Sequence, residues 1–140
     1  MNELKIALAK FWGNFENVPG QEPKLVPAFE EGRIPEKEKQ PFPYITYPVI
    51  KTGFGGQTIL TVSVWDKDMA NPGFQGRVDH VLSQISERVS EEGAVIRLGN
   101  NGGMVWLNRN GQNFISYMGD PDDKFIVRGI VRLQLKTFNY

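Results

Sequence analysis

The sequence predicts an α+β domain in which a mostly antiparallel β-sheet packs against two helices, with a long proline-rich arm attached. Three observations predict this class. Apolar and polar residues alternate through residues 125–138, which is the period of a half-buried strand. A single apolar stripe follows Asn71-Pro72 at the spacing of an amphipathic helix. Hairpin signals such as Asn110-Gly111 separate short apolar runs, so neighbouring strands are expected to be antiparallel.

Composition limits the possible classes of protein. The chain has 140 residues, of which 40% are hydrophobic and 23% charged, so we expect one globular domain over residues 1–140. Its 16 basic and 16 acidic side chains give a formal net charge of +0, which removes the overall attraction typical of a general nucleic-acid binder. The absence of cysteine excludes disulfides, thiolate catalysis and sulfur-based zinc sites. No apolar run reaches the roughly 18 residues of a membrane span, and we expect a cytosolic protein.

The amino-terminal third combines a helix with an irregular segment. Residues 3–15 carry an aromatic apolar stripe at helical spacing, made of Leu4, Leu8, Phe11, Trp12 and Phe15. Residues 17–43 contain six prolines and many charges, which excludes a regular helix or a central strand. A connection of this length is uncommon in a compact domain, so we expect an extended arm that becomes ordered on contact with a neighbour.

Two strands and a helix follow the arm. Residues 44–51 are rich in aromatic and β-branched residues, but Pro48 lacks an N–H and favours a sheet edge or a bulge. The glycine-rich segment 53–56 is expected to form a hairpin leading into a strand over residues 57–66. After Asn71-Pro72, the helical stripe consists of Val78, Val81, Leu82, Ile85 and Val89, and Gly93 is the expected stop.

The rest of the chain is predicted to be β-structure. Residues 94–98, 104–109 and 112–118 are three short strand-like runs separated by asparagine-glycine turns. Gly119-Asp120-Pro121-Asp122-Asp123 is a turn, because proline presets φ and aspartate side chains bond their own backbone. It leads into the long final strand.

No catalytic, cofactor or metal site can be assembled from the sequence. The glycines at 53–56 lack the Lys-Ser/Thr pair of a phosphate loop. His80, the one histidine, has no positioned partner for general-base work. Asp66 and Asp68, and the aspartates of residues 120–123, lack the spacing of a calcium loop, so turn formation explains them better. We therefore expect a protein without enzymatic activity.

The outward face of the final strand is basic. Arg128, Arg132 and Lys136, with Tyr117 and Tyr140 nearby, match the aromatic and cationic surfaces that bind single-stranded nucleic acid. An outward strand face is also normally charged, so a solvated or subunit-contacting face is the other interpretation.

Several segments together resemble one family. They are Pro41-Phe42-Pro43-Tyr44-Ile45 opening a strand, its partner at residues 58–65, the helix at 78–89, and Asp120-Pro121-Asp122-Asp123 leading into residues 126–132. In this order they resemble the tail-terminator, or tail-completion, proteins of long-tailed bacteriophages. The resemblance implies a subunit of a ring, expected to be a hexamer, on the head-proximal end of the tail tube. Such a ring stops tube polymerisation and offers the head connector a surface.

The same resemblance implies the partners and the location. The partners would be copies of the chain itself, the tail tube protein and the head connector or stopper, with no membrane, and DNA would only pass through the ring. The location would be the neck of a virion assembled in the host bacterial cytoplasm. The residues expected to make contacts are Phe29, Ile34, Pro48, Phe54, Arg128 and Arg132. The alternatives are another neck or tail component, such as a head-completion, minor capsid or tube subunit, or a nucleic-acid-binding sheet domain.

Overall fold

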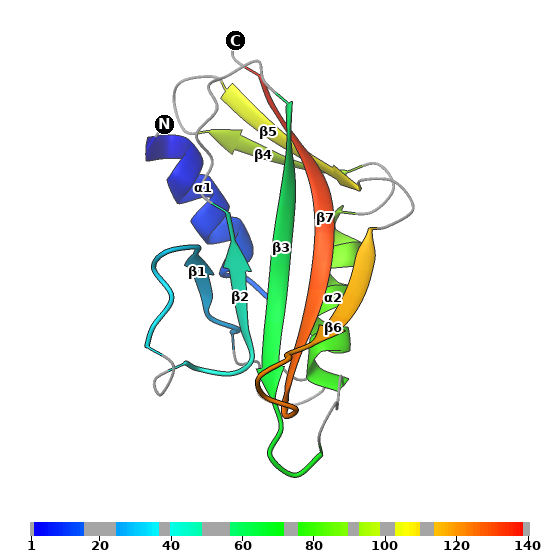
Figure 1. The fold of residues 1–140 in the computed structure, drawn as a ribbon. Coiled ribbons are helices and arrows are strands. Elements are labelled where there is room, and N and C mark those ends of the chain that lie inside the picture. The colour runs from blue at the N-terminus through cyan, green and yellow to red at the C-terminus, as the bar shows by residue number, and fades with distance from the viewer. Residues whose placement is uncertain are drawn as a thin grey trace.

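Two helices and seven strands make up the described part of the chain (Figure 1). The computed structural model describes residues 2–15, 25–36, 40–48, 57–71, 76–89, 93–98, 103–109 and 114–138. The elements are α1 (Asn2–Trp12), β1 (Ala28–Glu30), β2 (Tyr44–Tyr47), β3 (Gln57–Lys67), α2 (Gly76–Val89), β4 (Ala94–Leu98), β5 (Gly103–Arg109), β6 (Ile115–Gly119) and β7 (Ile126–Phe138). The α+β class, with a mostly antiparallel sheet, is therefore confirmed.

The pair β3–β7 is the centre of the sheet. The strand order is β1-β2-β3-β7-β5-β4, and β6 also pairs with β7. All pairs are antiparallel except β1–β2, which is parallel. Because β7 is 13 residues long, its edge opposite β3 holds β6 along residues 127–131 and β5 along residues 133–138. The sheet curls, and Figure 1 shows β4 and β5 crossing obliquely beside the β3–β7 pair.

Both helices contribute to one hydrophobic core. The inward positions of β3 and β7 are aliphatic, as the alternating pattern predicted, and pair across the strands as Leu60 with Leu133 and Val62 with Val131. The α1 residues Leu8 and Trp12 join the same core, where the Trp12 ring stacks on Tyr47 with centroids 6.4 Å apart. We call the sheet surface that faces this core the helix face and the opposite surface the open face.

Helix α2 lies unusually close to the sheet at Gly129. The predicted stripe is confirmed, since Val78, Val81, Leu82, Ile85 and Val89 are the buried residues of α2. A Cβ added at Gly129 would lie 2.5 Å from Val78 Cγ1 and 2.6 Å from Leu82 Cδ1. The absence of a side chain at this position therefore lets the helix approach β7.

Two expectations for residues 17–51 were wrong in part. Residues 44–47 do not form an edge, because β2 lies between β1 and β3. Pro48 directly follows β2, so its missing N–H interrupts no pair of the described ladder. Within the region expected to be an extended arm, Ala28–Glu30 forms β1 and occupies the outer position of the sheet. A short parallel pairing, which proline content does not reveal, therefore covers β2.

The remaining boundaries agree closely with the sequence pattern. Helix α2 is described from Gly76 onward, and the expected start at Asn71-Pro72 stays a prediction because residues 72–75 lie outside the described part. Gly93 has a φ of +86° and stands at the entry to β4, four residues beyond the helix end. The predicted hairpin at 53–56, with Phe54, also lies outside the described residues.

Candidate interaction surfaces

A row of four residues crosses the open face of the sheet. Tyr44, Trp65, Arg128 and Met118 are direct neighbours on β2, β3, β7 and β6. The rings of Tyr44 and Trp65 stack with centroids 6.3 Å apart, and the Arg128 guanidinium carbon lies 4.7 Å from the Trp65 centroid. The row therefore combines an aromatic pair with a cation held over one of its rings.

Hydrogen bonds hold Arg128 and Trp65 of this row to hydroxyl groups of the neighbouring strands β3 and β2. Arg128 Nε donates to Ser63 Oγ at 2.9 Å, and Trp65 Nε1 donates to Thr46 Oγ1 at 3.0 Å. Ser63 and Thr46 are both buried, so these bonds satisfy hydroxyls that water does not reach. Arg128 is thus half-buried and engaged within the chain, whereas the sequence pattern predicted a freely outward side chain.

Two phenylalanines from residues 25–43 cover one end of the row. The Phe29 and Phe42 rings lie 6.0 Å and 5.2 Å from the Tyr44 ring. Tyr44 is only 4% exposed in consequence, and burial raises the pKa of its hydroxyl. Phe29, predicted to make contacts between subunits, therefore makes a contact within its own subunit.

The other cations of the open face are also held by neighbours. Arg132 Nη1 donates to Ser116 Oγ at 3.0 Å, and Lys136 Nζ lies 5.3 Å from the centroid of Trp106. Tyr117 was expected beside these cations but belongs to the helix face, because it pairs with Gly129. Tyr140 lies outside the described residues. The basic stripe is present, but Arg128 and Arg132 donate hydrogen bonds to serines of the sheet and Lys136 lies over a tryptophan ring.

The six residues predicted to make contacts do not form one site. Arg128 and Arg132 lie on the open face, and Phe29 packs against Tyr44. Ile34 is 37% exposed in the segment after β1, while Pro48 is half-buried at the end of β2. Phe54 lies in the part of the chain that is not described.

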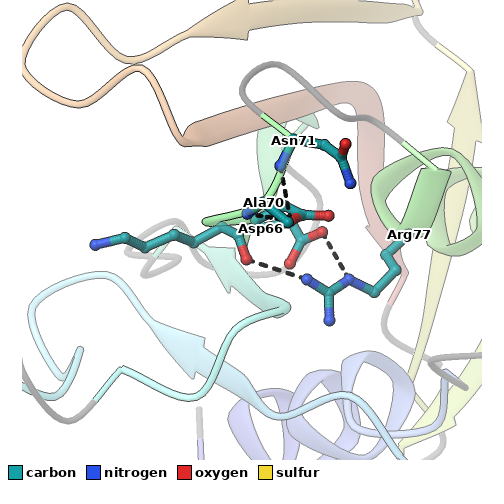
Figure 2. Close-up of polar contacts among 6 residues, drawn as sticks. Asp66, Ala70, Asn71 and Arg77 are labelled. Atoms are coloured by element: carbon teal, nitrogen blue, oxygen red, sulfur yellow. Dashed lines mark hydrogen bonds and ion pairs between the residues drawn. The ribbon is translucent and has the colours of Figure 1, made fainter.

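Sequence reasoning missed a buried ion pair between β3 and α2. Arg77 Nε lies 2.9 Å from Asp66 Oδ2, and Arg77 Nη2 donates to the Lys67 carbonyl at 3.1 Å (Figure 2). Asp66 is fully buried, and its Oδ1 has no hydrogen-bond partner within the described ranges. Burial raises the pKa of this carboxyl, although Arg77 opposes the shift. The sequence did contain a sign of this burial. Asp66 alternates in step with Leu60, Val62 and Val64, so its side chain lies on the same, inward face of the strand.

This ion pair joins α2 to β3. Asp68 accepts hydrogen bonds from the amides of Ala70 and Asn71 at 2.9 and 3.1 Å. The Ala70 amide is the main reason that the pKa of Asp68 is lowered. The turn interpretation is therefore confirmed for Asp68 and wrong for Asp66, which lies within β3 and pairs with Arg77. Among the residues that the structure places, no three His, Cys, Asp or Glu side chains gather in an arrangement that could hold a metal ion.

Three strands leave a backbone edge unpaired in the described sheet, because β1 pairs only with β2, β4 only with β5 and β6 only with β7. The edges of β4 and β6 each adjoin a hollow. A hollow of about 430 Å³ lies between β4 and α1, lined by Ile6, Ala7, Lys10, Phe11, Val95, Ile96 and Arg97. A second hollow of about 480 Å³ lies between β6 and α2, lined by Asp79, Leu82, Ser83, Ser86, Glu87, Ile115 and Tyr117.

Exposed apolar side chains accompany both edges. Val95 of β4 is 57% exposed, and Met118 and Tyr117 of β6 are 52% and 44% exposed. The Tyr117 hydroxyl hydrogen-bonds to Asp79, and burial together with this carboxylate raises its pKa to about 12. The β4 and β6 edges therefore combine unpaired backbone groups with exposed apolar side chains, a combination suited to binding another protein.

Comparisons with protein-family models, with curated proteins and with solved structures returned no match. No helix in the described ranges is long and apolar enough to cross a bilayer.

Proposed function

We propose that this chain is a structural tail protein of a long-tailed bacteriophage, which caps the head-proximal end of the tail tube as a ring. The observation that carries the proposal is that two of the unpaired strand edges of the described sheet, β4 and β6, have exposed apolar side chains. Edges of this kind pair readily with another chain. Identical subunits that join head to tail through two different surfaces form a closed ring when the rotation between them closes.

The ring would stop tube polymerisation and present its other surface to the head connector. The proposal includes the arm of residues 17–43 as a contact element. Ile34, 37% exposed after β1, is its best-supported contact residue within the described part. Phe54, expected at the tip of the glycine-rich hairpin, is the second. No enzymatic step and no cofactor belongs to this role.

Electron microscopy of the purified protein, alone and with tail tubes of the parent phage or prophage, tests the proposal. We expect to see a ring at one end of each tube, and we expect tubes to stop elongating when the protein is present. Ile34→Ser combined with Phe54→Ser should reduce the fraction of capped tubes, while the unfolding transition stays close to that of the wild type. Tubes that elongate unchanged at saturating protein would contradict the proposal.

Binding experiments separate this role from the alternatives. A tube subunit would copolymerise along the tube, and a head-completion protein would be retained by the connector without the tube. A nucleic-acid-binding domain would bind single-stranded DNA with an affinity that falls steeply with salt, and Lys136→Gln would flatten that slope. The contacts of Arg128 and Arg132 with serines of their own sheet favour the structural role.

A further inference from the structure

The β4 and β6 edges carry opposite charges. Among the described residues, the charged side chains that line the hollow beside β4 are Lys10 and Arg97. Those that line the hollow beside β6, within the same described set, are Asp79 and Glu87. All four side chains are exposed, and none of them forms an ion pair within the described part of the chain.

The acidic character of the second hollow follows from where the arginines of α2 point. Arg77 pairs with Asp66 in the interior. Arg88 lies over the Phe15 ring, 4.4 Å from its centroid, and donates to the Asn14 carbonyl at 2.8 Å. Both arginines therefore bind other parts of the chain, and neither forms an ion pair with Asp79 or Glu87 of the same helix.

The apolar parts of the two surfaces also match. We define the basic face as Ile6, Lys10, Val95 and Arg97, and the acidic face as Asp79, Glu87, Tyr117 and Met118. Ile6 and Val95 are 56% and 57% exposed, and the apolar residues of the acidic face are exposed to a similar degree. The strands at the two faces, β4 and β6, are each 5 residues long, so one edge can pair along the full length of the other.

The positions of the two faces permit both to be used at once. Figure 1 places α1 and β6 on opposite sides of the β3–β7 pair. A subunit can thus present its basic face to one neighbour and its acidic face to another. The formal net charge of +0 means that copies of the chain have no overall repulsion to overcome.

We infer that the basic face of one copy of this chain binds the acidic face of the next, with β4 and β6 pairing as edge strands of one continuous sheet. This inference rests on the proposed ring and names the contact that closes it. Charge complementarity selects a second copy as the occupant, because the chain itself supplies both halves. The contact is heterologous, which is the kind that a ring requires.

Charge reversal tests the inference. Lys10→Glu with Arg97→Glu makes both faces acidic, and Asp79→Lys with Glu87→Lys makes both faces basic. Each double variant should weaken self-association at least tenfold in sedimentation velocity, because like charges would meet at the contact. An equimolar mixture of the two should recover association, and native mass spectrometry should show the two variants in equal numbers. The variant with all four changes should associate by itself.

Matched controls show that the effect belongs to these faces. Asp122 and Lys124 are exposed residues of the turn between β6 and β7, and neither lines one of the two hollows. Asp122→Lys changes the charge in the same direction as the variant with Asp79→Lys, and Lys124→Glu in the same direction as the variant with Lys10→Glu. These controls should associate like the wild type. Far-ultraviolet circular dichroism and thermal unfolding should show that all variants fold.

The outcomes separate this inference from the proposed function. Double variants that associate like the wild type, or a mixture that stays monomeric, would overturn the inference while tube capping by the wild type still stands. Restored association without any capping of tubes would support the inference and reject the proposed function. A wild-type chain that is monomeric at millimolar concentration and also on tubes would reject both.

Discussion

The helix face and the open face of this sheet are built from different kinds of side chain. On the helix face, β3 and β7 present aliphatic residues such as Leu60, Val131 and Leu133, all buried against the two helices. On the open face, the same strands present the half-buried side chains of Trp65, Arg128 and Lys136. Arg128 lies over the Trp65 ring, and Lys136 lies over the Trp106 ring of β5. Aliphatic packing depends on complementary volume, whereas the open face depends on directional contacts between a few groups. We therefore expect the helix face to determine stability and the open face to affect it little.

The largest expected difference is between two aliphatic truncations. Leu133→Ala removes a fully buried side chain of the helix face and should lower the free energy of unfolding by about 2–5 kcal/mol. Ile59→Ala on the open face, where the side chain is 60% exposed, should change it by less than about 0.5 kcal/mol. Urea unfolding of both variants measures the difference. Equal losses would remove the distinction between the two faces.

The next effect is expected at the buried ion pair. Arg77→Ala leaves the Asp66 carboxylate buried without a cation and should lower the free energy of unfolding by about 2–3 kcal/mol. The expected loss is smaller than is usual when a buried ion pair is broken, because the Arg77 side chain is 36% exposed. Asp66→Asn removes the charge but keeps an acceptor for Arg77, and should stay within about 1 kcal/mol of the wild type.

The pH dependence of the same pair has a defined sign. Because burial raises the pKa of Asp66 in the folded state, its protonated form favours folding. That contribution is fully present below the unfolded pKa and is lost as the pH rises through the raised folded value. The free energy of unfolding of Asp66→Asn, measured with urea, should therefore rise relative to that of the wild type as the pH rises through that window. If this difference instead fell with rising pH, the effect of Arg77 on the pKa of Asp66 would be larger than the effect of burial.

A smaller effect is expected where α2 approaches β7. Gly129→Ala places a methyl group against Val78 and Leu82 and should lower the free energy of unfolding by about 1–3 kcal/mol. Gly119→Ala is the matched control, because a Cβ there meets nothing within 4 Å. Thermal unfolding should separate the two variants. A neutral Gly129→Ala would show that α2 can move away from the sheet without loss.

The smallest effect is expected on the open face itself. Arg128→Ala removes the cation over Trp65 and the hydrogen bond to the buried Ser63 hydroxyl, and should lower the free energy of unfolding by about 1 kcal/mol. Arg128→Lys should retain part of this stabilisation, since the lysine ammonium can still lie over the Trp65 ring. Trp fluorescence should report the change at Trp65. A loss as large as that of Leu133→Ala would contradict the comparison of the two faces.

The sequence predicted the elements well where one residue pattern suffices. The stripe of α2 and the alternation of β7 appear as expected, since each depends only on the spacing of apolar residues along one element. The sequence placed β2 at an edge because Pro48 lacks an N–H, and could not show that β1 would cover it. Three-residue parallel pairing leaves no periodic signal. The candidate surfaces were missed for a related reason: Lys10 and Arg97 are far apart in sequence and meet only when α1 packs beside β4.

The sequence by itself determined the class of fold, the apolar stripes and the turns, because these follow from local chemistry and from the periods of helix and strand. Only the tertiary structure decided which edges stay unpaired, which arginines turn inward and which charges gather at each edge. These properties depend on contacts between residues distant in the chain. The sign of the charge along the β4 and β6 edges is therefore a property of the folded molecule, and the proposed contact between copies depends on it.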